Sequence, residues 1–169
     1  DYTYQGLFGY TSGATIKNLN VAGEFSSTFS SKGEVYAGVL VGYGVNTTIS
    51  NCEVNAKSPD GANMAFNRKV TFGAVAGKLE GSNLSNTLAY MPINIGYDLL
   101  NAYTLKIGGV VGFAKNSNFT KVANFADVDV EFNGESEPAF VSNVYVGGLI
   151  GEIDGSMTKI KDCVAGGSI

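Results

Sequence analysis

Gly147-Gly148-Leu149-Ile150-Gly151 decides the fold of this chain, because versions of this five-residue block occur five times. The other copies are QGLFG at 5–9, GVLVG at 38–42, GAVAG at 73–77 and GGVVG at 108–112. The blocks end at Gly9, Gly42, Gly77, Gly112 and Gly151, so the repeat is about 35 residues long. A period of this length is typical of repeat architectures, in which each unit buries its apolar face only against its neighbours.

The residues before each block alternate like a β-strand with one buried face. Apolar or aromatic residues stand seven and five positions before the final glycine, as Val35 and Ala37 do in the second copy, with Tyr36 between them. The same count places Tyr2 and Tyr4 at the buried positions of the first copy. A period of two predicts a strand in every repeat, with Tyr36 and Tyr145 on its outer face.

The alternation breaks inside the block, where two apolar residues follow each other, as in Leu40-Val41. Neighbours on a strand cannot point to the same side, so we expect the chain to turn a corner here. Glycine permits backbone angles that other residues avoid, which makes the block glycines the expected bends. The apolar residues expected to stack behind them are Leu7, Leu40, Val75, Val110 and Leu149.

A polar turn follows each block, and then comes an apolar, any, Asn, apolar unit. The five units are IKNL at 16–19, ISNC at 49–52, LSNT at 84–87, FTKV at 119–122 and IKDC at 160–163. Asn tolerates left-handed backbone angles, so the third position predicts a second bend. The fourth unit departs from the pattern because Lys121 replaces Asn.

Composition narrows the function classes. The 169 residues have a net charge of −4 and a single arginine, Arg68, which argues against binding to a nucleic-acid backbone. The longest apolar runs, such as Val144–Ile150, are much shorter than the roughly 20 residues of a membrane span. The absence of histidine removes the commonest metal ligand and general base. We expect one repeat domain over 1–169, cut from a longer protein that began before Asp1.

The combination of GGLIG with IKDC, and of GVLVG with ISNC, resembles the GLUG motif of bacterial surface proteins. The resemblance covers nearly the whole chain, although the third and fourth copies are degenerate. It implies a right-handed parallel β-helix from a large exported, adhesin-like protein, or from the non-catalytic region of a surface peptidase. It implies no catalytic residues.

The repeats by themselves also predict an all-β solenoid of about five rungs, with variable loops or hairpins between them, since stacking like on like produces a continuous core. The alternative is a β-propeller, whose blades have a similar period, but the chain lacks tryptophan and the turns that accompany it. Cys52 and Cys163 occupy one column of the alignment three rungs apart, about 14 Å at the usual strand spacing. A disulfide needs Cα atoms within about 7 Å, so we predict two buried free thiols.

Few residues suggest a binding site. Asp127, Asp129 and Glu131 are weak Ca²⁺ candidates, because carboxylate clusters bind calcium, but their alternation with apolar residues also fits a solvent-facing strand. Glu152 and Asp154 are expected to approach this cluster. The glycine blocks lack the Lys-Ser/Thr of a phosphate-binding loop and are expected to be structural. Outward aromatic residues are the expected ligand contacts: Tyr36, Tyr43 and Tyr145.

These observations predict a non-catalytic module that serves in cell-surface adhesion or as a structural scaffold, without cofactor or metal. We expect an extracellular monomer whose loops contact a host or matrix protein or a glycan, with no nucleic-acid partner. The alternatives are a carbohydrate-active β-helix enzyme, which would need aligned carboxylates or basic residues in a groove, and the repeat region of a surface peptidase.

Overall fold

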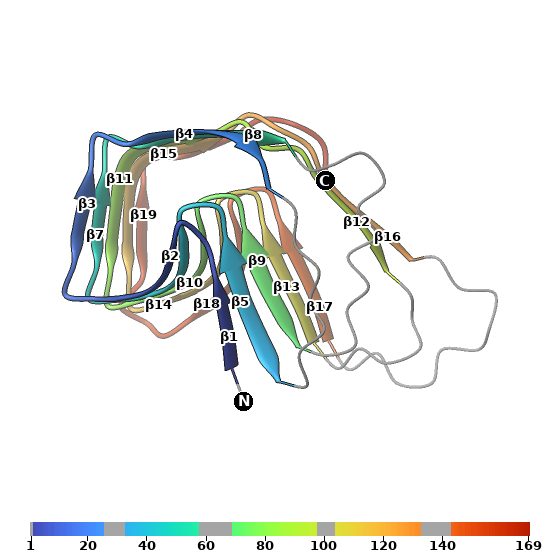
Figure 1. The fold of residues 1–169 in the computed structure, drawn as a ribbon, viewed down its shortest axis with the longest axis horizontal. Helices are drawn as coiled ribbons and strands as arrows, with labels where there is room; N and C mark the ends of the chain where they lie inside the picture. Colours follow the sequence, from blue (N-terminus) through green and yellow to red (C-terminus); the bar gives the residue numbers. More distant parts are fainter. Residues whose placement is uncertain (1, 26–32, 58–68, 98–103, 133–142) are drawn as a thin grey trace.

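The computed structural model describes residues 2–25, 33–57, 69–97, 104–132 and 143–169. Within these ranges the chain forms β-strands and no helix, and therefore no helix with the length and hydrophobicity of a membrane span. Figure 1 shows the strands of successive repeats stacked side by side in layers. The predicted all-β solenoid is confirmed.

Three parallel sheets make up the coil, and each repeat gives one strand or one strand pair to each sheet. Sheet A contains β1 (Tyr2–Gln5), β5 (Glu34–Gly38), β9 (Val70–Gly73), β13 (Thr104–Gly108) and β17 (Asn143–Gly147). Sheet B contains β2 (Phe8–Ser12), β6 (Val41–Val45), β10 (Ala76–Glu80), β14 (Val111–Lys115) and β18 (Ile150–Asp154). Sheet C contains β3 (Thr15–Lys17), β7 (Thr48–Ser50), β11 (Asn83–Ala89), β15 (Asn118–Asn124) and β19 (Lys159–Lys161), with β4 (Asn20–Glu24), β8 (Glu53–Lys57) and β20 (Val164–Ala165) on their extensions.

A fourth, two-stranded sheet pairs β12 (Ile93–Tyr97) with β16 (Val128–Phe132). The variable segment after sheet C in the third repeat is therefore extended where the structure describes it. The strand pairs of the described residues are parallel, and from the second repeat onward they link equivalent positions of adjacent repeats, as in the pairing of Val35 with Val70 and of Leu105 with Val144. The propeller alternative is wrong, because propeller blades are built from antiparallel strands.

The block forms the corner between sheets A and B. β5 ends at Gly38 and β6 begins at Val41, so the intervening bend lets Leu40 and Val41 both enter the core. The block glycines were expected to adopt backbone angles that other residues avoid. This expectation is wrong, because neither Gly38 nor Gly73 has a positive φ. The glycines are required by close packing instead, since a Cβ on Gly73 would lie 2.5 Å from the carbonyl oxygens of Ala76 and Val110.

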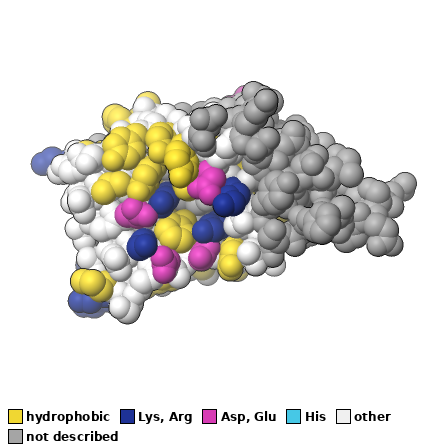
Figure 2. Space-filling view, turned by 90° about the horizontal axis from the view of Figure 1, so that it is seen from below, with side chains coloured by type: hydrophobic (Ala, Val, Ile, Leu, Met, Phe, Trp, Pro, Cys, Tyr) yellow, Lys and Arg dark blue, Asp and Glu magenta, His cyan; other side chains and the backbone are white. Residues whose placement is uncertain are grey.

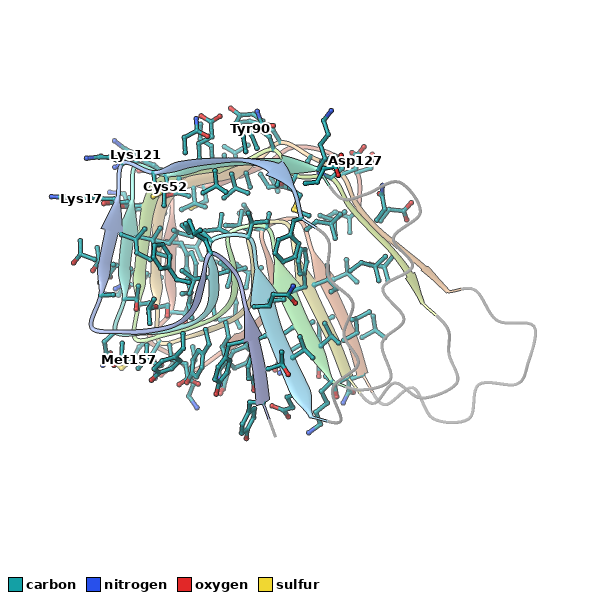
Figure 3. All side chains as sticks on the ribbon, in the orientation of Figure 1. Lys17, Cys52, Tyr90, Lys121, Asp127 and Met157 are labelled. Carbon is teal, nitrogen blue, oxygen red and sulfur yellow. The ribbon has the colours of Figure 1, made fainter. Side chains whose placement is uncertain are left out.

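The second predicted bend does use left-handed backbone angles. Its residues have φ between 47° and 57°, and they are Asn18, Asn51, Asn86, Lys121 and Asp162. The side-chain amide of Asn51 donates to Asn18 Oδ1 at 3.3 Å, which links two repeats along this edge. Even the departing residue, Lys121, keeps the conformation, so the corner geometry is set by the stacked neighbours. Lys17 and Lys121 project outward at this edge (Figure 3).

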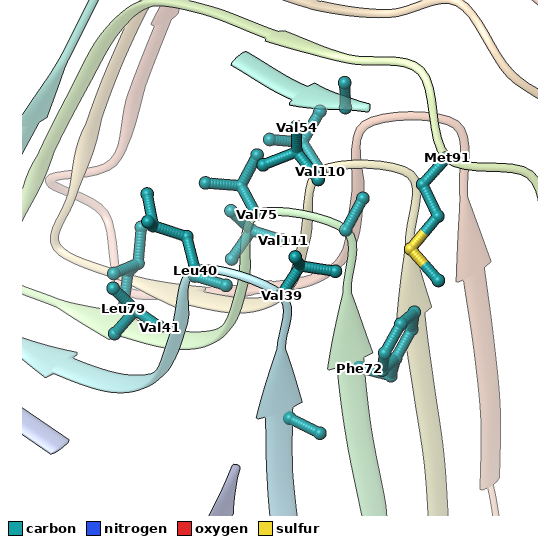
Figure 4. Close-up of a cluster of buried hydrophobic side chains, with 14 of the residues drawn as sticks. Val39, Leu40, Val41, Val54, Phe72, Val75, Leu79, Met91, Val110 and Val111 are labelled. Carbon is teal, nitrogen blue, oxygen red and sulfur yellow. The ribbon is translucent and has the colours of Figure 1, made fainter. Parts of the chain in front are cut away.

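The core consists of apolar ladders between the sheets. Leu40, Val75 and Val110 are fully or nearly fully buried, and Figure 4 shows them with Val41, Leu79, Phe72 and Met91. Burial of each such side chain contributes about 1.5–3 kcal/mol, which accumulates along the ladder. Leu149 is only partly buried and Leu7 is 58% exposed, because they belong to the last and first repeats.

The two cysteines share a column, as predicted, and both are free thiols. Cys52 is buried inside the coil (Figure 3), whereas Cys163, in the fifth repeat, is only half-buried. The prediction of a buried thiol is therefore wrong for Cys163. Each Sγ donates to the carbonyl oxygen two residues earlier at 3.3 Å. Thr87 makes the same kind of bond from the same column, to the carbonyl oxygen of Ser85 at 2.9 Å.

The first repeat differs from the alignment by one residue. β1 pairs Thr3 with Val35 and Tyr4 with Tyr36, whereas the sequence count placed Tyr2 and Tyr4 in the buried columns. The corner of the first repeat is one residue shorter, which shifts every strand residue before it to the opposite face. Tyr2 and Tyr4 consequently lie on the outer face of sheet A, and Thr3 and Gln5 take the inward columns.

Candidate functional site

The outer faces of sheets A and B meet at the glycine corner and form a groove across the repeats, which opens downward in the view of Figure 1. We call this surface the A–B groove. Sheet A lines it with Tyr4, Tyr36, Thr71, Lys106 and Tyr145. Sheet B lines it with Tyr10, Tyr43, Lys78, Phe113 and Glu152. The final block glycine of each repeat allows the two sheets to approach closely at its apex.

Tyrosines fill the end of the A–B groove formed by the first two repeats. The rings of Tyr2 and Tyr4 stack on Tyr36 with centroids 6.0 and 5.9 Å away. Tyr10 packs against Tyr4 at 5.7 Å and edge-on against Tyr43 at 5.5 Å. We call these five residues the tyrosine cluster. Such contacts add about 0.5–1.5 kcal/mol per pair beyond area burial, so the rings hold one another in place.

Charged side chains line the groove beside the tyrosine cluster. Lys78 Nζ lies 4.6 Å from the ring centroid of Tyr43 and 5.1 Å from that of Tyr36, and 2.9 Å from Glu80 Oε1. Lys106 Nζ lies 4.3 Å from the Phe113 centroid. Figure 2 shows the result on the face seen from below, where dark blue and magenta side chains alternate next to a group of yellow ones. The lysines are thus fixed by ring faces as well as by carboxylates.

Every lysine that the structure describes in the groove is paired with a carboxylate. The ion pairs are Lys69–Glu34 at 3.1 Å, Lys78–Glu80 at 2.9 Å, Lys106–Glu152 at 2.7 Å and Lys115–Asp154 at 3.2 Å. Glu152 and Asp154 therefore belong to the groove, and the expectation that they approach Asp127 is wrong. These four positive and four negative charges balance, so the described part of the groove has no net charge.

Two tyrosine hydroxyls extend these ion pairs. Tyr43 donates to Glu80 Oε2 at 2.6 Å, and Tyr36 donates to Glu34 Oε2. Burial raises the pKa of both phenols, and the neighbouring carboxylates raise it further. Burial also raises the pKa of each carboxyl, but the hydrogen bonds from tyrosine and lysine outweigh it, so the pKa values of Glu34 and Glu80 lie below their usual range. The phenols stay protonated donors and the carboxylates stay ionised acceptors.

The three predicted contact residues lie in the groove, but they differ in exposure and in distance from the tyrosine cluster. Tyr36 is only 9% exposed because the surrounding rings cover it, Tyr43 is half-buried, and Tyr145 lies in the last repeat, separated from the cluster. Tyr4 and Tyr10 offer much more surface, at 38% and 52% exposed. The alignment hid the role of Tyr4, because a one-residue shift at QGLFG reverses its face.

A small hollow lies between the sheets where the charged side chains begin. It measures about 130 Å³ and is lined by Glu34, Tyr36, Lys69, Thr71, Lys78, Thr104, Lys106 and Phe113. Ordinary small-molecule pockets hold about 300–1,000 Å³, so the hollow does not enclose a whole ligand of drug size. The A–B groove is suited to a longer ligand that lies along it and places one group in the hollow.

The calcium candidates do not converge on a site within the described structure. Among the described residues, no group of three or more His, Cys, Asp or Glu side chains is arranged to hold a metal ion. Asp127 and Asp129 are exposed and alternate with the buried Val128, and Asp127 Oδ1 accepts from the Ser168 amide at 2.7 Å. This arrangement is that of a solvent-facing strand. The Glu131 side chain lies outside the described part.

A scan against protein-family models and searches of curated proteins and of solved structures find no match to this chain. The resemblance to the GLUG motif therefore stays a prediction from the residues that carry it.

Proposed function

We propose that this chain is a non-catalytic binding module, part of an extracellular adhesin or scaffold, and that the A–B groove is its contact surface. The observation that carries the proposal is the tyrosine cluster, in which exposed rings are held rigidly by other rings beside a row of fixed ion pairs. Rigid aromatic side chains supply contact area at low entropy cost, which is why they are enriched at binding surfaces. The assignment to the cell surface depends on the GLUG resemblance.

The carboxylates of the groove favour binding over catalysis. A glycosidase needs one carboxyl group whose pKa is raised, so that it can act as a general acid. The pKa values of Glu34 and Glu80 are lowered instead, and each carboxylate accepts hydrogen bonds from its own tyrosine. The carbohydrate-active enzyme remains the second candidate because the groove contains aligned acids, and the repeat region of a surface peptidase would equally be non-catalytic.

Binding and turnover assays separate these functions. The purified chain should bind saturably to at least one member of a panel of immobilised glycans and matrix proteins, and it should release no product from the same glycans on long incubation. If product increases with time and with protein concentration, the chain is a carbohydrate-active enzyme and the proposal of a non-catalytic binding module is wrong. Absence of binding to every member of the panel would contradict the proposal.

A further inference from the structure

We propose that the A–B groove binds an uncharged glycan chain that lies parallel to the solenoid axis, with its first sugar rings on the tyrosine cluster. This inference rests on the proposed function and names the ligand class for the same surface. Three observations carry it, and they are the spacing of the groove residues, the charge balance, and the absence of a free strand edge along the middle of the described groove.

The groove presents side chains at a regular spacing. Equivalent residues of adjacent repeats are about 4.8 Å apart, because their strands are hydrogen-bonded neighbours. Tyr4 and Tyr10 begin the two rows that continue through Tyr36 and Tyr43. A ligand that is itself a repeating chain can therefore meet one side chain from each sheet at each step, beginning with the tyrosine pairs of the first two repeats. The apolar face of a sugar ring packs on an exposed aromatic ring, which Tyr4 and Tyr10 provide.

The charge balance selects a neutral chain. Each lysine of the described groove lies within 3.2 Å of a carboxylate oxygen, so an acidic glycan would have to compete with Glu80 or Glu152 for the same ammonium group. Hydroxyl groups both donate and accept, so a neutral sugar can bond to Lys106 and Glu152 together without separating them. Such bonding leaves both charges paired, and it therefore avoids the free-energy cost of burying an unpaired charge under the ligand.

The strands favour a glycan over an extended peptide. Peptides commonly bind a sheet by pairing with a free edge. In the middle of the groove, β5, β9 and β13 have hydrogen-bonded neighbours on both sides, as do β6, β10 and β14. Only side chains face the ligand there. Rings, hydroxyls and paired charges are the groups that recognise sugars.

The test compares two double variants that remove similar aromatic pairs. Y4A/Y10A removes groove rings whose centroids are 5.7 Å apart and which are 38% and 52% exposed. Y90A/F125A removes a stacked pair at 5.4 Å, 38% and 50% exposed, whose Tyr90 lies across the molecule from the groove in Figure 3. Thermal unfolding of both variants and of the wild-type chain establishes that each is folded before binding is measured.

Affinity electrophoresis and titration calorimetry use xyloglucan, galactomannan and mixed-linkage β-glucan as neutral probes, with polygalacturonate and heparin as acidic ones. We expect at least one neutral polysaccharide to bind, Y4A/Y10A to weaken this binding by about tenfold or more, and Y90A/F125A to leave it within about twofold. High salt should change the affinity little, because no net charge is neutralised.

Three results would overturn the inference. They are preferential binding to the acidic probes with a strong salt dependence, equal losses in the two variants, and binding to no glycan at all. If a matrix protein binds through the groove while every glycan fails, the ligand class is wrong and the proposed function stands. If neither kind of ligand binds, both are wrong.

Discussion

Replacement of Gly112 by alanine is expected to destabilise the solenoid strongly, although the change adds a single methyl group. Gly112 lies in β14 at the apex of the A–B groove, where it faces the preceding repeat's strand in sheet A. An ideal Cβ at this position would lie 2.7 Å from both the amide nitrogen and the carbonyl oxygen of Phe72. Both atoms belong to the backbone, so no rotamer change can relieve the overlap.

The expected cost follows from that overlap. The Cβ would be about 0.7 Å short of the 3.4 Å at which ordinary contact begins, so β9 and β14 would have to separate. Overpacking of this kind costs about 1–3 kcal/mol, and the fully buried Phe72 would move with its strand. Alanine gains back at most about 0.4–1 kcal/mol through the unfolded chain. The expected net loss is therefore about 1–2 kcal/mol.

Gly166→Ala is the matched control, because the atom nearest to an ideal Cβ there lies at 3.6 Å and φ is ordinary. Gly9→Ala should fall between the two, since its nearest atom lies at 3.2 Å. Urea unfolding followed by circular dichroism gives the free energies. We expect Gly166→Ala to stay within about 0.5 kcal/mol of the wild type. If Gly112→Ala is no less stable than Gly166→Ala, the close-approach explanation of the block glycines is wrong.

Three further predictions concern single columns. Lys121→Asn should stabilise the fold by about 0.5–1 kcal/mol in the same urea assay, because asparagine adopts the left-handed backbone more readily; a loss of stability would show that the lysine makes a compensating interaction. Above pH of about 10, unfolded tyrosine loses its proton while folded Tyr43, whose pKa is raised by burial and Glu80, keeps it, so the free energy of unfolding should fall with rising pH. Tyr43→Phe should make that fall shallower, and an unchanged slope would contradict the assigned hydrogen bond. A thiol reagent should modify Cys163 before Cys52 in the folded protein and both after unfolding, whereas equal rates in the folded state would contradict the burial of Cys52.

The repeat spacing predicted the fold because a solenoid is nearly one-dimensional. Each column of the alignment becomes a ladder as soon as the repeats stack, so Leu40, Val75 and Val110 could be assigned to the core without a structure. The second bend was predictable for the same reason, since Asn18 and its counterparts report a local backbone preference. The apolar column is strictly periodic and the Asn column reflects a local backbone preference, so both can be read without knowing how the repeats pack.

The candidate site was only partly predictable. The outward positions of Tyr36 and Tyr145 followed from the period of two, and Tyr43 was a candidate because it follows a block glycine. The facing of sheet B toward sheet A followed from neither pattern. The angle at the glycine corner brings Tyr36 and Tyr43, from different sheets, within 5.6 Å of each other. The same angle pairs Lys106 with Glu152, which the sequence had placed near Asp127. No rule of composition relates residues 46 positions apart.

The amino-acid sequence by itself determined the period, the strands and the two kinds of corner, because these depend on side-chain size, polarity and backbone preference within one repeat. Only the tertiary structure decided which faces oppose each other across the A–B groove. It also decided that Tyr4 belongs there, since a one-residue shortening at the first corner reverses the faces of β1. Register and inter-sheet angle come from the packing of whole repeats, and the proposed binding surface depends on both.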